Sequence, residues 1–177
     1  MELTRKQKSK KYFLYFLIIL ILDLLQNVAG LFPQIGGARC FLLLPAIIIL
    51  AMGEDIVWAS VLGLFAGLLW DLTGSVHLGF NCIVLTAACF LTAVFSAYIA
   101  RDTFITNIIT SAITISLYCA MYWLFFIIIR GVNKGANTIF TFYMPCAIYT
   151  IVLTPVLWLI LTPIKKKLNH TKKQEFK

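Results

Sequence analysis

Residues 56–72, IVWASVLGLFAGLLWDL, form an apolar run that carries one charged residue, Asp71, at its end. Gly63, Gly67 and Asp71 follow one another at intervals of four, and Gly74 comes three positions later, so a helix places them on one face. Glycines let a neighbouring backbone approach closely. This face is therefore predicted to pack against another helix rather than against lipid.

Similar apolar stretches lie on both sides of this segment. Together they predict an all-α integral membrane protein in which about six transmembrane helices form a compact bundle. The expected spans are residues 12–32, 40–52, 56–72, 80–100, 103–129 and 139–162, within a membrane domain of residues 12–163. The second span would be about 20 Å long as a helix. Two alternatives for it are a start near Ile35 and a re-entrant helix.

The composition excludes a soluble globular domain. Of the 177 residues, 61% are hydrophobic and only 12% are charged, whereas about a quarter are charged in an ordinary soluble domain. No polar stretch is long enough for a catalytic domain outside the membrane.

Basic residues gather at the two ends of the chain, in residues 1–11 and 164–177. An even number of spans with both ends cytoplasmic would place twelve Lys and Arg residues inside and three outside, as the positive-inside rule requires. The net charge of +8 comes with no motif for nucleic-acid binding. The basic ends are instead expected to contact anionic lipids.

Asp71 has two interpretations. A carboxylate in hydrocarbon is costly, so its side chain should point into the bundle or towards a partner. In the first interpretation it caps the turn at residues 73–79 by accepting hydrogen bonds from loop amides. In the second it contacts a partner or a substrate.

A second polar group lies in the first span, where Asp23, Gln26 and Asn27 share one side of the helix. Three polar groups on one face of a membrane helix need hydrogen-bond partners. Three roles are open: internal hydrogen bonding, a contact between subunits, and an ion or proton pathway.

Enzyme chemistry has little support in the sequence. His77 and His170 have no neighbouring Cys or His at the spacing of a metal site, so neither a metal nor a cofactor is expected. The five cysteines all lie in apolar surroundings. They are interpreted as small core residues, with a palmitoylated or reactive thiol as the alternative.

The segment Gly63-Leu64-Phe65-Ala66-Gly67-Leu68-Leu69-Trp70-Asp71-Leu72, followed by Leu78-Gly79, resembles the rod shape-determining protein MreD family. That family has a glycine-rich apolar helix ending in a D-L pair, with an L-G pair several residues later. The resemblance extends to the chain length, to the six spans, and to a first helix with polar residues before a Pro-containing loop. The chain departs from the family at Gly53-Glu54-Asp55, where the family has a basic link, and in its long basic tail.

The resemblance implies a non-enzymatic subunit of the bacterial machinery that builds lateral peptidoglycan, in the cytoplasmic membrane. Its implied partner is MreC, with MreB, RodA and a class B penicillin-binding protein as further partners. The implied partner-binding or helix-packing residues are Gly63, Gly67, Asp71, Gly74, Gly79, Asp23, Gln26 and Asn27.

An alternative is the substrate-binding S-component of an energy-coupling-factor vitamin transporter, a small six-helix membrane protein that the bundle would also resemble. Such subunits dock the coupling subunit through an A-x-x-x-A motif in the first helix. Residues 12–32 offer only Ala29 and Gly30, at the outer end. A ligand pocket could in that case be lined by Asp23, Gln26, Asn27, Asp71 and Asn81.

Overall fold

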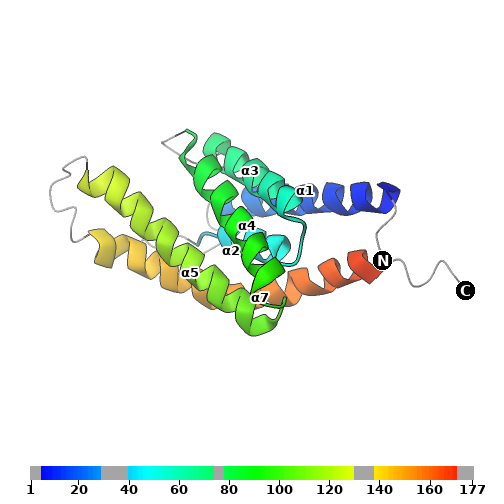
Figure 1. Cartoon of the computed structure of the whole chain (residues 1–177). Helices are drawn as coiled ribbons and strands as arrows, with labels where there is room; N and C mark the ends of the chain where they lie inside the picture. The colour runs from blue at the N-terminus through cyan, green and yellow to red at the C-terminus, as the bar shows by residue number, and fades with distance from the viewer. Residues whose placement is uncertain (1–4, 29–39, 74–77, 130–137, 171–177) are drawn as a thin grey trace, which may run out of the picture.

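The computed structural model describes residues 5–28, 40–73, 78–129 and 138–170, which form six helical rods and no strand (Figure 1). The rods are α1 (Arg5–Asn27), α2 (Leu43–Ala51), α3 (Ile56–Thr73), α4 (Phe80–Tyr98), α5 (Phe104–Trp123) continued by the π-helix η1 (Leu124–Ile128), and the π-helix η2 (Ile139–Tyr143) continued by α7 (Met144–His170). The predicted all-helical fold class is confirmed.

Four of these rods are long and apolar enough to cross a membrane. They are Ile56–Thr73, Phe80–Tyr98, Phe104–Ile128 and Ile139–Asn169. Helix α1 is also long, but its apolar stretch is bounded by Lys11 and interrupted by Asp23. Large apolar side chains such as Ile83 on α4 and Val152 on α7 are exposed on the outside of the bundle, as expected for helices solvated by lipid.

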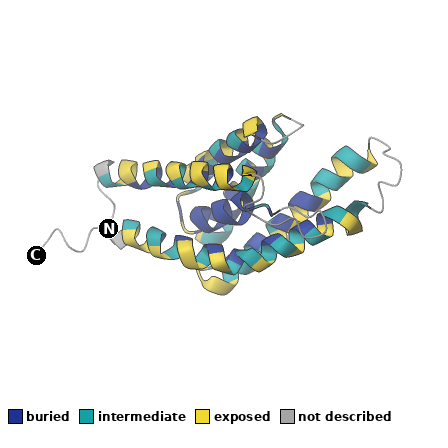
Figure 2. Cartoon of the chain, turned by 180° about the vertical axis from the view of Figure 1, so that it is seen from behind, coloured by how far each residue is buried: buried dark blue, intermediate teal, exposed yellow. Residues whose placement is uncertain are grey.

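Helix α2 is the centre of the fold. All nine of its residues are buried, and it contacts α1, α3, α4, α5 and α7 (Figure 2). At 1.5 Å per residue it is about 13 Å long, less than half the roughly 30 Å of a hydrocarbon core. Helix α2 is therefore a half-helix enclosed by the longer ones.

Helices α3 and α4 form the most extensive helix pair, whereas α4 and α5 touch only slightly. The first turns of α1 and the last turns of α7 lie at the same end of the bundle (Figure 1). The start of η2 and the end of η1 lie at the opposite end. The bundle thus has two distinct ends, and each holds a cluster of polar side chains.

Candidate functional site

The glycine face of α3 packs against α4 of the same chain. A Cβ atom at Gly67 would lie 2.7 Å from the Asn81 carbonyl oxygen and would also clash with the Cα atom of Cys82. A Cβ atom at Gly63 would lie 2.6 Å from the Leu85 carbonyl oxygen. Real Cβ atoms do not come this close to backbone, so both positions require glycine for the observed packing.

Asp71, at the end of this face, caps the N-terminus of α4. Its Oδ2 atom accepts hydrogen bonds from the backbone amides of Gly79 (2.9 Å) and Cys82 (3.1 Å), and its Oδ1 atom from that of Asn81 (3.4 Å). A carboxylate at a helix N-terminus satisfies free amides and complements the helix dipole. Gly79 has φ +90°, a left-handed conformation that favours glycine. Gly74 lies outside the described residues.

The polar residues of α1 join three helices at the same end of the bundle. The Asn27 amide donates to the backbone oxygen of Asp23 (2.9 Å) and to Thr73 Oγ1 (3.1 Å), and Thr73 Oγ1 donates to Asp23 Oδ1 (3.2 Å). Gln26 Oε1 accepts a hydrogen bond from the Leu43 amide (2.9 Å) at the start of α2. Asp23 is buried and Asn27 is exposed. We call Asp23, Gln26, Asn27, Asp71 and Thr73 the outer cluster.

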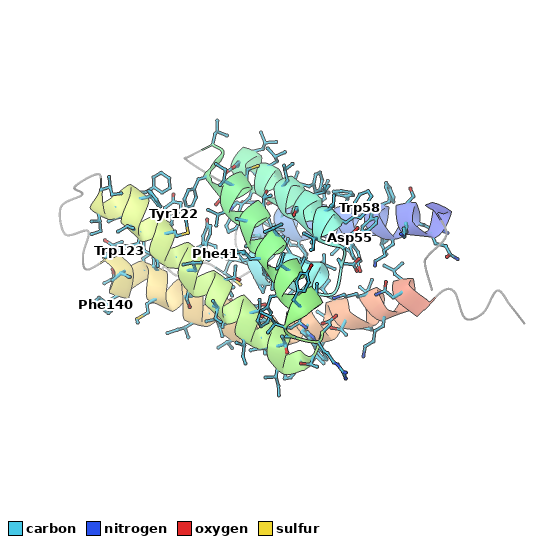
Figure 3. All side chains as sticks on the ribbon, in the orientation of Figure 1. Phe41, Asp55, Trp58, Tyr122, Trp123 and Phe140 are labelled. Atoms are coloured by element: carbon cyan, nitrogen blue, oxygen red, sulfur yellow. The ribbon has the colours of Figure 1, made fainter. Side chains whose placement is uncertain are left out.

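Aromatic rings fill the space beside this cluster. The Tyr118 hydroxyl donates to Asn81 Oδ1 (2.7 Å), and its ring stacks on Trp70 with 5.3 Å between centroids. Phe41 packs against both rings. Figure 3 shows Tyr122 and Trp123 at this end of the bundle, and Asp55 and Trp58 towards the other end. The aromatic rings pack against one another in the interior, while the Tyr118 hydroxyl keeps a hydrogen-bond partner.

A buried ion pair lies at the opposite end. Lys11 Nζ on α1 is 2.6 Å from the Glu54 carboxylate, in the turn between α2 and α3, and the Tyr15 hydroxyl donates to the same carboxylate (3.1 Å). The exposed fractions of the two charged side chains are only 7% and 3%. Tyr12 stacks on Trp58 beside the pair, with 4.1 Å between ring centroids. A pair this deeply buried is stable only as a pair, because either charge alone would be desolvated without compensation.

Lys165 of α7 forms a second set of polar contacts at the same end of the bundle. Its Nζ atom donates to the backbone oxygens of Ile49 (2.9 Å) and Met52 at the end of α2, and to Asp102 Oδ2 (2.7 Å) in the turn between α4 and α5. The last carbonyls of a helix have no partners within that helix and carry its negative dipole end, so a cation there is favourable. We call Lys11, Tyr15, Glu54, Asp102 and Lys165 the inner cluster.

Comparison with known proteins identifies the family. The model of the rod shape-determining protein MreD family matches residues 7–167 of the 177-residue chain. The chain belongs to the MreD family. This agrees with the resemblance of the Gly63–Leu72 segment, and it favours a role in determining rod shape over that of a vitamin-transporter S-component. No curated protein and no solved structure matched the chain.

The match to the MreD family spans both clusters, from Lys11 to Lys165. The outer cluster contains four of the residues singled out in the sequence, namely Asp23, Gln26, Asn27 and Asp71. The structure uses these four side chains to hold helices of this chain to one another. Whether any of them also contacts a partner stays a prediction.

The inner cluster of this MreD family member was missed in the sequence. Lys11 and Lys165 belong to the basic ends of the sequence, and Glu54 and Asp102 lie between predicted spans. The sequence does contain one indication of the cluster. The Lys and Arg count places Glu54 and Asp102 on the same side of the membrane as the two lysine-rich ends of the chain. Opposite charges at the same membrane face are candidates for pairing, but only the fold brings these four together.

No metal site is formed among the residues that the structure describes, since no three His, Cys, Asp or Glu side chains lie close enough to share an ion. Four of the five cysteines are buried and Cys82 is partly buried, all as free thiols. The polar groups of the two clusters form helix caps, hydrogen bonds between helices and ion pairs.

Proposed function

We propose that this chain is a non-enzymatic membrane scaffold of the cell-elongation (rod) complex, which binds MreC and helps to organise lateral peptidoglycan synthesis. The observation that carries the proposal is the family match across residues 7–167. That match runs from α1 to α7, which supports a role for the bundle itself in the family function. MreB, RodA and a class B penicillin-binding protein are the further partners that we propose.

The bundle has properties that suit a scaffold. Its polar groups are engaged in joining helices, as Lys165 joins α2, α7 and the turn before α5. Its outer surfaces are apolar, with exposed Phe90 and Leu91 on α4 and Ile113 on α5. A surface of this kind can pack against the membrane helix of a partner such as MreC.

We place the partner contact at the outer cluster, where Asn27 and Thr73 remain exposed between α1 and α3. Gly63 and Gly67 support this contact indirectly, because they set the position of α3 against α4. In this proposal a partner helix would extend the hydrogen-bond network that Asp23 begins.

We also propose that both ends of the chain are cytoplasmic and face anionic lipids. Lys8 and Lys10 on α1 and Lys166 on α7 are exposed at the same end of the bundle. Each basic residue near an anionic surface contributes about 1 kcal/mol of attraction. Lys11 and Lys165 do not take part, because both are buried in ion pairs.

The test is purification of the tagged chain from native membranes in mild detergent, followed by mass spectrometry of the co-purifying proteins. We expect MreC, together with RodA and its penicillin-binding partner. Recovery of a pair of ATPases with a coupling membrane subunit would instead establish the transporter alternative, with Asp23 and Asp71 as ligand-binding candidates.

The same purification locates the contact. Asn27→Ala with Thr73→Val should reduce recovery of MreC, whereas Val152→Ala on the exposed face of α7 should not. Asp71→Ala and Gly67→Leu test the α3 face. If both proteins insert normally and still hold MreC, the glycine face has no part in binding the partner.

A further inference from the structure

Two buried side-chain oxygens on α5 take no part in the hydrogen bonds of either cluster. Among the described residues, Asn107 Oδ1 and Ser111 Oγ are the buried side-chain oxygens with no hydrogen-bond partner. Both residues lie on α5, and the exposed fraction of each is 0%. They are four positions apart, so they share one face of the helix with roughly 5–6 Å between their Cβ atoms.

Ser111 differs from three threonines of the helices in how its hydroxyl is bonded. A buried Ser or Thr in a helix usually satisfies itself by donating to the carbonyl oxygen four residues earlier. Thr86, Thr150 and Thr154 all do so, at 2.6, 2.7 and 3.0 Å. Ser111 does not, although an unsatisfied buried hydroxyl is costly. Its hydroxyl is left without a partner among the described residues.

The neighbours of Asn107 define the chemistry of the position. Asn107 Nδ2 donates to Asp102 Oδ1 (2.6 Å) and to the Thr103 carbonyl oxygen (2.8 Å), which leaves Oδ1 as a free acceptor. Asp102 in turn is paired with Lys165. A chain of hydrogen bonds therefore runs from Lys165 through Asp102 into the bundle and stops at Asn107 Oδ1.

We infer that Asn107 and Ser111 form a binding site for a buried water molecule. The water would donate one hydrogen bond to Asn107 Oδ1. It would form a second with the Ser111 hydroxyl, in which either oxygen can be the donor. A cation is disfavoured, because two neutral oxygens would have to bind it near the positive charge of Lys165. An anion is disfavoured, because the negative charge of Asp102 would repel it. A small neutral molecule with both donors and acceptors matches the chemistry of the two oxygens, and a buried water needs only two to four hydrogen-bond partners.

A double-mutant cycle tests the inference by thermal unfolding of the purified full chain in detergent. If water bridges the two side chains, Ser111→Ala removes a partner and should lower the melting temperature by about 2–4 °C. In the Asn107→Ala background the same change should have little effect, because the bridge is already lost. Ser116→Ala, on the exposed side of α5, is the matched control and should leave the melting temperature unchanged.

The opposite result would overturn the inference. A hydroxyl with no partner destabilises the fold, so its removal would then raise the melting temperature or leave it unchanged, equally in both backgrounds. A second measurement is radiolytic hydroxyl-radical labelling in ¹⁸O water, which marks residues next to bound water. Prompt labelling within residues 104–115 that disappears in Asn107→Ala is expected, and its absence from the parent protein would count against the site.

Discussion

At the scale of single residues, the charged and amide side chains within the bundle hold backbone ends. Asp71 accepts hydrogen bonds from three amides at the start of α4, and Gln26 accepts from the first residue of α2. Free amides at a helix start cost most where water is absent. Asp71 therefore fits the cap that the sequence offered as one of its two interpretations, and contact with a partner through it remains a proposal.

Replacing Asp71 should weaken the start of α4. Asp71→Ala removes the acceptor for Gly79, Asn81 and Cys82, and should lower the free energy of unfolding by about 0.5–2 kcal/mol, the range measured for helix caps. Asp71→Asn keeps one acceptor oxygen and should lose roughly half as much. Thermal unfolding of the three proteins in the same detergent is the measurement. Equal melting temperatures for Asp71→Ala and the parent would show that the cap contributes nothing.

At the scale of the elements, α2 is the helix whose position most needs explanation. It is too short to cross the membrane, and both its ends lie inside the bundle, where the backbone groups must find partners in the protein. Gln26 of α1 holds its first residue, and Lys165 of α7 holds two carbonyls at its end. The half-helix is thus fixed by side chains from the first and last helices of the chain.

Removal of the Lys165 charge should destabilise the packing of α2 in the bundle. Lys165→Met leaves the carbonyls of Ile49 and Met52 without their donor, and it leaves Asp102 without its cation. Each buried group left unsatisfied costs about 1–3 kcal/mol, so a fall of several degrees in melting temperature is expected. Lys166→Met is the control, because the neighbouring Lys166 is exposed. If both variants melt at the same temperature, the carbonyl contacts do not stabilise α2.

At the scale of the whole molecule, the two clusters mark the two ends of the bundle. The inner cluster contains two cations and two anions, which balance one another. Beside it Lys8 and Lys10 of α1 and Lys166 of α7 are exposed and add positive charge to this end. The outer cluster has carboxylate and amide groups from Asp23, Gln26, Asn27 and Asp71. This difference in charge between the ends favours an orientation with the inner cluster towards the cytoplasm.

Reporter fusions test that orientation. Green fluorescent protein joined after Lys177 should fluoresce, and alkaline phosphatase at the same position should be inactive, because both ends of the chain are expected in the cytoplasm. Insertion of either reporter after Asn133, between η1 and η2, should give the reverse pattern. Active phosphatase after Lys177 would contradict an even number of crossings.

Composition and hydropathy were enough to predict the helical membrane fold, because hydrocarbon imposes a long apolar run on each spanning helix whatever its neighbours are. The glycine spacing of α3 was likewise informative, since a four-residue interval defines a face within a single helix. The family resemblance came from the same segment. All of these properties are local to a stretch of chain.

The pairing of Lys11 with Glu54, and of Lys165 with Asp102 and the end of α2, could not be predicted in this way. Lys165 and Met52 are 113 positions apart, and their contact exists only when α7 packs beside α2. A lysine near a membrane end satisfies the positive-inside rule equally well in lipid headgroups or in a buried ion pair. The choice depends on which helices are neighbours, because burial of a charge is tolerated only where the fold supplies its partner.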